Sequence, residues 1–139
     1  MRVGVAALCL LSACGGSGTY GAGQCGAAPD GWFDPRTERP HLSVGNEIRL
    51  DAEGGLRWNG QPRTEEGVGE YLAISARMAP QPAVVLVVDN DAECGDVRRI
   101  RSVMAGTAIC DAGLCGEVSD SSNARINQEM RGNQLELVQ

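Results

Sequence analysis

The stretch AVVLVV, residues 83–88, decides how this sequence folds, because it holds six apolar residues in a row and four of them are valine. A run of this length that is rich in β-branched residues predicts a strand that is covered on both faces or lies at the centre of a sheet. The prolines of APQPA (79–83) precede the run, and the polar loop DNDAECGD (89–96) follows it. We therefore expect residues 83–88 to be the core strand of the domain.

A hairpin is expected before this strand. Apolar and charged residues alternate over residues 48–50 and again over 56–58, which is the pattern of half-buried strands. The sequence EGG at 53–55 predicts the turn between them. Asn-Gly at 59–60 is expected to end the second strand, and Pro62 to prevent further pairing.

A helix is predicted over residues 64–79. Thr64 offers an N-cap hydroxyl, and Glu65 and Glu66 complement the positive end of the helix dipole. Apolar residues recur at spacings of three and four along the segment, so one face is expected to pack on the hairpin.

A second helix is expected after the core strand and ends at Gly106. Arg98, Arg99 and Arg101 are expected to face water on this helix. Its buried face is expected to carry Val97, Ile100, Val103 and Met104.

Residues 107–118 are expected to form a last extended segment that turns back at 111–113, and residues 119–139 a polar tail that is frayed or weakly helical. The order of elements is then β-β-α-β-α-β. This order predicts an α+β plait, with a mixed sheet and two helices on one face. The final strand-helix-strand unit is expected to be right-handed, with its two strands parallel.

Length and charge limit the classes of function. At 139 residues the chain has room for one domain. The net charge of −6 and the pI near 4.7 give no electrostatic reason to bind nucleic acid. We also predict no cofactor.

Residues 1–16, MRVGVAALCLLSACGG, have the pattern of an export signal. The apolar run over 3–11 is too short to cross a bilayer but matches the hydrophobic region of a secretory signal. Leu11-Ser12-Ala13-Cys14 resembles the bacterial lipoprotein box, which implies that residues 1–13 are removed and that Cys14 carries fatty acyl chains such as palmitate. The alternative is a soluble protein in which this apolar segment is a buried strand or helix.

The predicted anchor also suggests which membrane carries the protein and how the chain divides into segments. Gly15, where a sorting signal for the inner membrane would have Asp, resembles the pattern of outer-membrane lipoproteins. Residues 14–40 are expected to form a Gly/Pro-rich tether, residues 41–118 the domain, and residues 119–139 the tail. Trp32, Phe33 and a bonded Cys25 are expected to hold the later part of the tether against the domain.

Four cysteines remain after Cys9 leaves with the signal and Cys14 is acylated. An even number in an exported chain favours disulfides. A helix of about ten residues would separate Cys94 from Cys110 by roughly 15 Å, and a disulfide needs Cα atoms within about 7 Å. Two pairings stay open: Cys25 with Cys94 and Cys110 with Cys115, or Cys25 with Cys110 and Cys94 with Cys115.

Residues 44–118 resemble the periplasmic domain of the ExbD/TolR family. The resemblance is carried by the hairpin GGLRWNGQP (54–62), the helix around Leu72, PAVVLVVD (82–89) and GDVRRIRSVM (95–104). It implies an α+β domain that contacts envelope proteins or peptidoglycan in a biopolymer transport system. Members of the family also use an acidic residue in a membrane span to sense protons. This sequence offers no such span to carry that residue, so the resemblance does not extend to proton coupling.

Other patterns predict no catalytic or metal site. Residues 89–93 begin like a calcium loop, but Cys94 and Ile100 occupy the places of its required Gly and Glu. The cysteines lack the spacing of a zinc site. His41 is the single histidine and lies in a proline-flanked linker, where it is expected to be exposed rather than a catalytic base.

Two groups of side chains are candidates for binding. Arg98, Arg99 and Arg101 could grip a carboxylate or phosphate of a partner, although such a run is more often a solvated helix face. The aromatic residues could form a ligand platform or fill the core; they are Trp32, Phe33 and Trp58.

The sequence therefore predicts a non-enzymatic lipoprotein of the bacterial cell envelope that faces the periplasm. Its lipid anchor binds the bilayer, and its domain docks an envelope protein or peptidoglycan. One alternative is a small periplasmic enzyme with thiol chemistry at Cys94, Cys110 or Cys115. The other is a purely structural surface lipoprotein.

Overall fold

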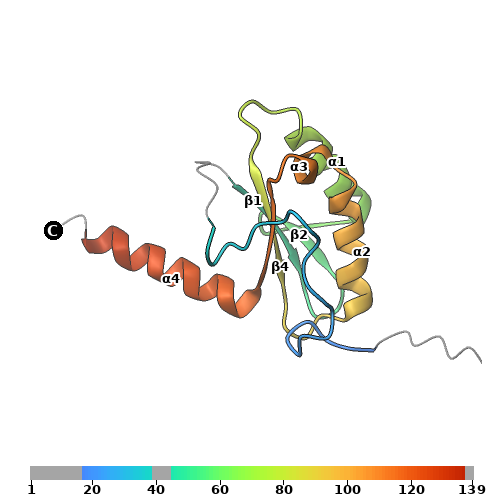
Figure 1. Cartoon of the computed structure of the whole chain (residues 1–139), viewed down its shortest axis with the longest axis horizontal. Coiled ribbons are helices and arrows are strands. Elements are labelled where there is room, and N and C mark those ends of the chain that lie inside the picture. Colours follow the sequence, from blue (N-terminus) through green and yellow to red (C-terminus); the bar gives the residue numbers. More distant parts are fainter. Residues whose placement is uncertain (1–16, 39–44, 137–139) are drawn as a thin grey trace, which may run out of the picture.

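The computed structural model in Figure 1 describes residues 17–38 and 45–136 and has an α+β fold around one five-stranded mixed sheet. The strand order is β3-β2-β1-β4-β5. Along the chain, the elements are β1 (Gly45–Leu50), β2 (Leu56–Trp58), β3 (Gln61–Arg63), α1 (Glu65–Ser75), β4 (Ala83–Val88), α2 (Cys94–Ala105), α3 (Ala108–Asp111), β5 (Cys115–Ser119) and α4 (Asp120–Glu136).

The apolar run 83–88 forms β4, an inner strand as the sequence predicts. It pairs in parallel with β1 on one side and with β5 on the other. Val84, Leu86 and Val88 are fully buried in the core cluster, together with residues of α1 and α2. The three longest strands of the sheet are β1, β4 and β5, and they run in the same direction. Their carboxyl ends therefore lie at the same end of the domain.

The hairpin is confirmed, but the prediction that Pro62 prevents further pairing is wrong. β1 and β2 are antiparallel, and β3 pairs with β2 so that Pro62 lies opposite Arg57. Asn59 and Gly60 both have positive φ, at 48° and 84°, which suits the tight turn that joins β2 to β3. Proline is tolerated because β3 is an edge strand, where a missing N–H interrupts no ladder.

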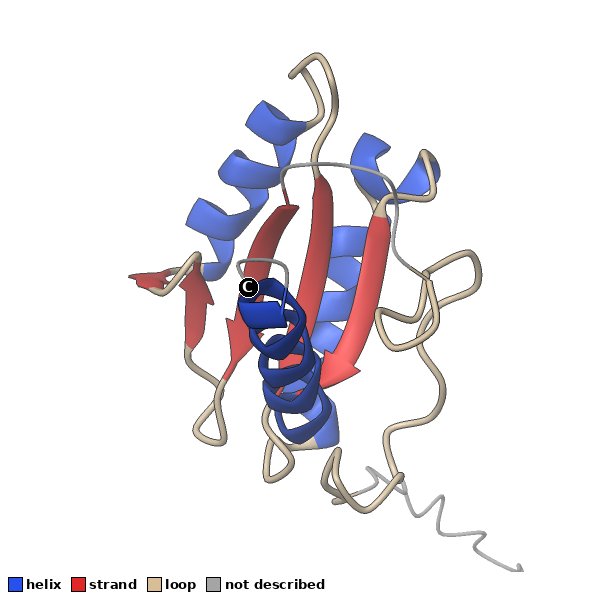
Figure 2. Ribbon diagram, turned by 90° about the vertical axis from the view of Figure 1, so that its left-hand side faces the viewer, coloured by secondary structure: helices blue, strands red, loops and turns tan. Residues whose placement is uncertain are grey.

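Helices α1, α2 and α3 cover one face of the sheet (Figure 2). Thr64 caps α1 as expected, because its hydroxyl accepts a 3.0 Å bond from the backbone N–H of Gly67. The helix ends at Ser75, short of the predicted residue 79. The start of the expected extended segment is instead the short helix α3, which lets the Ile109 side chain enter the core with no exposed surface.

The opposite face of the sheet receives α4, which forms from the segment expected to be a frayed or weakly helical tail (Figure 2). Its first turns are held by an ion pair between Asp120 and Arg49 and by burial of Ser122. Asn123 also reaches Glu47 of β1 at 3.5 Å. Sequence periodicity could not indicate α4, because polar side chains rather than an apolar stripe attach it to the sheet.

Among the residues that the structure describes, no helix is both long and apolar enough to cross a membrane.

Candidate functional site

The segment 17–38, called the arm below, packs along the domain beside β5. At its start, Thr19 bridges to Glu93, the residue before α2, and in its later part Phe33 bridges to Gly116 of β5. The Phe33 N–H donates to the Cys115 carbonyl at 2.9 Å, and the Glu117 N–H donates to the Phe33 carbonyl at 3.4 Å. The arm thus pairs with the outer edge of β5, which would otherwise be an open template for another strand.

Gly116 permits the close approach of the arm. An ideal Cβ at this position would lie 2.5 Å from Cε2 of Phe33, so a larger residue would displace the ring. Phe33 is buried there at 8% exposure, whereas its neighbour Trp32 is only partly buried. The expectation that these two aromatic residues hold the arm is therefore confirmed, with Phe33 as the main contact.

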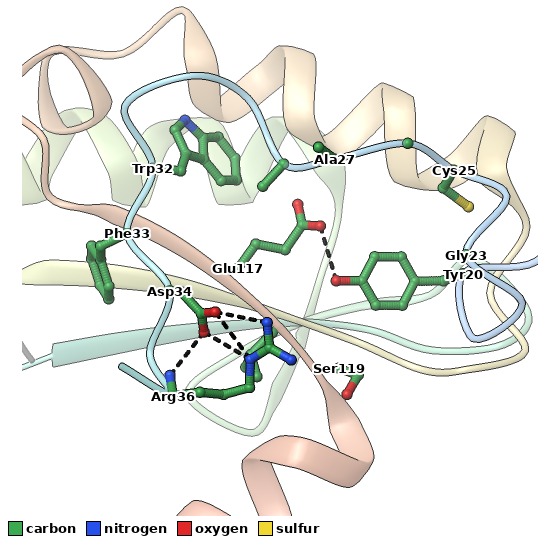
Figure 3. A pocket seen from close by; sticks show the side chains of 13 residues that line it. Tyr20, Gly23, Cys25, Ala27, Trp32, Phe33, Asp34, Arg36, Glu117 and Ser119 are labelled. Atoms are coloured by element: carbon green, nitrogen blue, oxygen red, sulfur yellow. Dashed lines mark hydrogen bonds and ion pairs between the residues drawn. The ribbon is translucent and has the colours of Figure 1, made fainter. Parts of the chain in front are cut away.

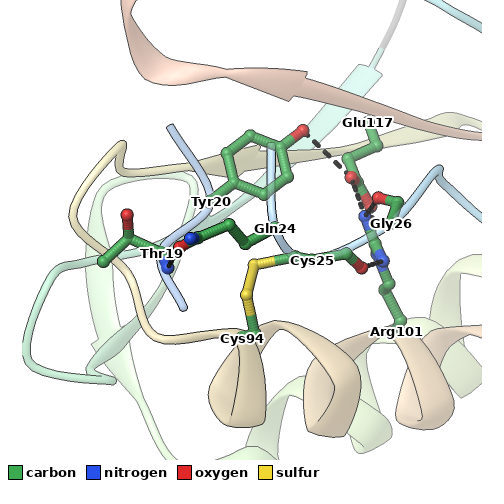
Figure 4. The surroundings of a disulfide bond; sticks show 8 residues. All are labelled: Thr19, Tyr20, Gln24, Cys25, Gly26, Cys94, Arg101 and Glu117. Carbon is green, nitrogen blue, oxygen red and sulfur yellow. Dashed lines mark hydrogen bonds and ion pairs between the residues drawn. A yellow bond between two sulfur atoms is a disulfide. The ribbon is translucent and has the colours of Figure 1, made fainter. Parts of the chain in front are cut away.

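Two disulfides resolve the pairing that the sequence left open. Cys25 of the arm bonds Cys94 at the start of α2, with a Cα–Cα distance of 4.9 Å (Figure 4). Cys110 of α3 bonds Cys115 of β5, with a Cα–Cα distance of 4.8 Å. The first bond fixes the arm to the domain, and the second closes the short loop before β5.

Arg101 does not face water, contrary to the sequence prediction. It is 8% exposed and forms a two-bond ion pair with Glu117 of β5, with Nε–Oε2 and Nη2–Oε1 distances of 2.8 and 2.6 Å. Its remaining donors reach the backbone carbonyls of Cys25 and Gly26 at 2.9 and 3.1 Å (Figure 4). The guanidinium therefore joins α2, β5 and the arm, and the bond to Glu117 raises its pKa further.

Tyr20 completes this cluster from the arm. Its hydroxyl donates to Oε1 of Glu117 at 3.0 Å. Burial, reinforced by the nearby negative charge of Glu117, raises the pKa of Tyr20 far above its ordinary value. The phenol is therefore a protonated donor at any physiological pH, and we refer to Tyr20, Arg101 and Glu117 as the buried cluster.

A pocket of about 440 Å³ opens between the arm and β5, next to the buried cluster (Figure 3). Tyr20 and Trp32 form aromatic walls on either side of the Glu117 side chain, and Asp34 and Arg36 lie at its rim. The pocket is lined by Tyr20, Gly23, Cys25, Gly26, Ala27, Ala28, Trp32, Phe33, Asp34, Arg36, Glu117, Val118 and Ser119. We call it the arm pocket.

The chemistry of the arm pocket is suited to binding. Both carboxylate oxygens of Glu117 are occupied by Arg101, and one of them also by Tyr20, so this group is poorly placed to act as a base or nucleophile. At the rim, hydrogen bonds from the Arg36 side chain lower the pKa of Asp34. The pocket thus presents an exposed cation–anion pair beside aromatic walls, which can hold a ligand with both polar and apolar groups.

The other predicted site residues lie apart from the arm pocket. Arg99 is exposed and bonded to Glu65 and Asp96, both at 2.7 Å. Arg98 is also exposed and lines a separate hollow with residues 17–19. Thus the three candidate arginines do not form one surface, because Arg101 points into the domain and the other two point outward.

The remaining candidate residues lie either in the core or in a loop. Trp58 is buried at 7% exposure and stacks on Tyr71, with ring centroids 5.3 Å apart. The acidic loop is a local turn in which the Asp91 N–H donates to the Asp89 carboxylate at 2.8 Å. Among the residues that the structure describes, no three metal-ligating side chains gather into a cluster. Cys14 and His41 lie outside the described residues.

Sequence reasoning missed the buried cluster, although one signal was present. Arg101 follows Val97 by four residues and precedes Met104 by three, so the apolar spacing of α2 places it on the buried face. A charged residue there requires a partner, and Glu117 is an acidic residue in an otherwise buried strand. Tyr20 gave no such signal, since it lies in a Gly-rich segment without periodicity.

A comparison with protein-family models found no family that matches this chain. No curated protein shows significant similarity to it.

Proposed function

We propose that this chain is a lipid-anchored lipoprotein of the bacterial cell envelope, whose domain binds an envelope protein or peptidoglycan and catalyses no reaction. The observation that carries the proposal is the pairing of all four cysteines within residues 17–38 and 45–136 into two disulfides. Such bonds form and persist in oxidising compartments such as the bacterial periplasm. They agree with the export signal and lipoprotein box of residues 1–14.

The disulfides also bear on the alternative of a thiol enzyme. A thiol enzyme needs a thiolate that can reach its substrate, and such groups lie in exposed, electropositive surroundings. Cys94 and Cys115 are 1% and 0% exposed, so each is a structural half of a bond in the core. This burial favours a binding function over thiol chemistry.

The arm pocket supports recognition as the task of the domain. It combines aromatic surface from Tyr20 and Trp32 with the charged pair Asp34 and Arg36 at its rim. Its walls are fixed by the Cys25–Cys94 bond and the buried cluster, so ligand binding requires little ordering of the chain. A preformed and chemically mixed surface of this kind suits a peptide or a glycan strand of the envelope.

The proposed relation to the ExbD/TolR family rests on the order of elements. Without the short β3 and α3 and the final α4, the chain follows β1-β2-α1-β4-α2-β5, with β4 and β5 parallel. In that family, such a domain contacts envelope components. We propose that this chain keeps the contact role and replaces the membrane span by the acyl anchor.

The anchor is tested by mass spectrometry of the full chain isolated from a bacterial host. The amino-terminal peptide should begin at Cys14 and carry acyl chains, and the protein should sediment with membranes. The variant C14S should lose the acyl chains and leave the membrane fraction. Unacylated protein with an intact Met1 would overturn the proposal.

Recognition is tested by photo-crosslinking in cells, with a photoreactive residue at Ala28 in the wall of the arm pocket. The matched control carries it at Ala73, an equally small and exposed residue on α1. A discrete adduct at Ala28 but not at Ala73, identified as envelope protein or peptidoglycan, supports the proposal. Adducts at neither position in acylated protein would favour the purely structural alternative.

A further inference from the structure

The arm is fixed to the domain from its first described residues. The Gly18 carbonyl accepts a 2.9 Å bond from the Cys94 N–H, and the Tyr20 N–H donates to the Ala92 carbonyl at 3.0 Å. The Gly21 N–H donates to the Asn90 carbonyl at 2.7 Å. The chain therefore joins the domain at one defined place, beside the start of α2 and the loop between β4 and α2.

This attachment leaves little chain between the domain and the proposed lipid anchor. Gly18 follows Cys14 by four residues, and a chain of four residues spans at most about 14 Å in any conformation. The six-residue strand β4 alone is about 20 Å long. The tether is thus shorter than the domain, so it cannot let the domain turn over relative to the membrane.

We propose that the domain sits directly on the lipid surface in one orientation, with the start of α2 and the β4–α2 loop toward the headgroups. This inference rests on the acylation of Cys14 in the proposed function. The opposite end, at the connection between α1 and β4, then points away from the bilayer (Figure 1). That outer end carries the two exposed large apolar side chains of the described residues, Ile74 and Met78.

The two loops at the end that faces the lipid carry exposed acidic side chains. Asp91 and Glu93 are exposed in the β4–α2 loop. The hairpin turn between β1 and β2 reaches the same end, because Gly54 approaches the Asp96 carboxylate, and this turn adds the exposed Glu53. Anionic headgroups repel such a surface over about one Debye length, roughly 8 Å at physiological ionic strength. Hence the short tether, and not charge attraction, holds this end at the membrane.

The test uses two variants that each introduce a single lysine side chain, because the sequence contains no lysine. R98K places it near the lipid-facing end, where Arg98 lines the hollow beside residues 17–19. R77K places it at the outer end, just after α1. Both arginines are exposed and both substitutions keep the charge, so neither should disturb the fold.

Acylated full-length protein is labelled with an amine-reactive fluorophore and reconstituted into vesicles of phosphatidylethanolamine and phosphatidylglycerol that carry a short-range headgroup quencher. Quenching should be several-fold stronger for R98K than for R77K, and labelled wild-type protein gives the background. A 20-residue Gly/Ser insertion after Gly16 adds a flexible span of about 25 Å. This insertion should lower the quenching of R98K to that of R77K.

Equal quenching of the two labels in protein with an acylated Cys14 would overturn the orientation and leave the anchor intact. Strong quenching of R98K that persists with the inserted linker would also overturn it, because the contact would not then depend on tether length. Absence of acyl chains at Cys14 by mass spectrometry would overturn the proposed function, and the orientation with it.

Discussion

Replacing Arg101 by methionine tests the role of the buried cluster. The change removes the two bonds to Glu117 and the two to the carbonyls of Cys25 and Gly26, and it leaves the Glu117 carboxylate buried with Tyr20 as its remaining partner. Breaking a buried pair by removing one partner costs about 3 to 5 kcal/mol. With a urea m-value of about 1.5 kcal/mol/M, the unfolding midpoint should fall by roughly 2 to 3 M.

The assay is equilibrium urea unfolding of the oxidised protein, followed by circular dichroism. R99M is the matched control, because Arg99 lies two residues away on the same helix and bonds Glu65 and Asp96 at the surface. Half of its side chain is exposed, so the solvent-screened pair should contribute less than about 1 kcal/mol.

A double variant separates the buried charge from the lost hydrogen bonds. R101M/E117L removes both charges and should recover about 1 to 2 kcal/mol relative to R101M alone. The cluster would not hold the arm as described if R101M and R99M lowered stability equally, or if the double variant were less stable than R101M.

Three further predictions concern the arm and its contacts. In urea unfolding, C25S/C94S should lower the free energy of unfolding by about 4 kcal/mol and C110S/C115S by about 2 kcal/mol. The two bonds close loops of 69 and 5 residues, and the entropy that a disulfide removes from the unfolded chain grows with loop length. Equal losses would contradict this ranking. G116A should lower the free energy of unfolding by about 1 to 3 kcal/mol, because the added methyl group displaces the Phe33 ring. The control is G69A in α1, where a Cβ meets nothing within 4 Å. It should leave the free energy of unfolding unchanged or raise it by about 0.5 to 1 kcal/mol. Burial beside Glu117 raises the pKa of Tyr20 above its ordinary 10.0, so the unfolded chain releases the phenol proton first and stability should fall as pH rises above 10. Between pH 9 and 10.5, the urea midpoint should therefore fall less for Y20F than for the wild-type protein. An equal fall would show that ionisation of Tyr20 does not cause the loss of stability.

The centre of the fold could be predicted because residues close together in the sequence determine its strands, turn and helix. The valine-rich apolar run of β4 indicates a buried strand, and the alternation on either side of the glycines at 54 and 55 indicates a hairpin with one buried face. The helix capped by Thr64 follows from the same local chemistry. These elements could be predicted because their hydrophobic pattern and the intrinsic propensities of their residues indicate the same secondary structure.

The candidate site could not be predicted to the same extent, because tertiary contacts determine it. Arg101 lies in a run of arginines that indicates a solvated face, and its burial is made favourable by partners far away in the chain, Glu117 16 residues later and the carbonyls of the arm. Pro62 predicts the end of a strand unless the strand is known to lie at an edge. The arm has the composition of a flexible linker, and a disulfide together with one aromatic contact gives it a fixed path.

The long contacts of the arm have a consequence for how the protein reaches its native state. Tyr20 bonds a residue 97 positions later, and the Cys25 carbonyl bonds one 76 positions later. The arm therefore completes its contacts only when the last strand is in place, because Tyr20 and Phe33 both bond residues of β5. Such high contact order slows folding. In a chain that emerges amino terminus first, Tyr20 and Phe33 cannot make their contacts with β5 until that strand has formed, so full protection of the arm from proteases should arise together with that of the sheet.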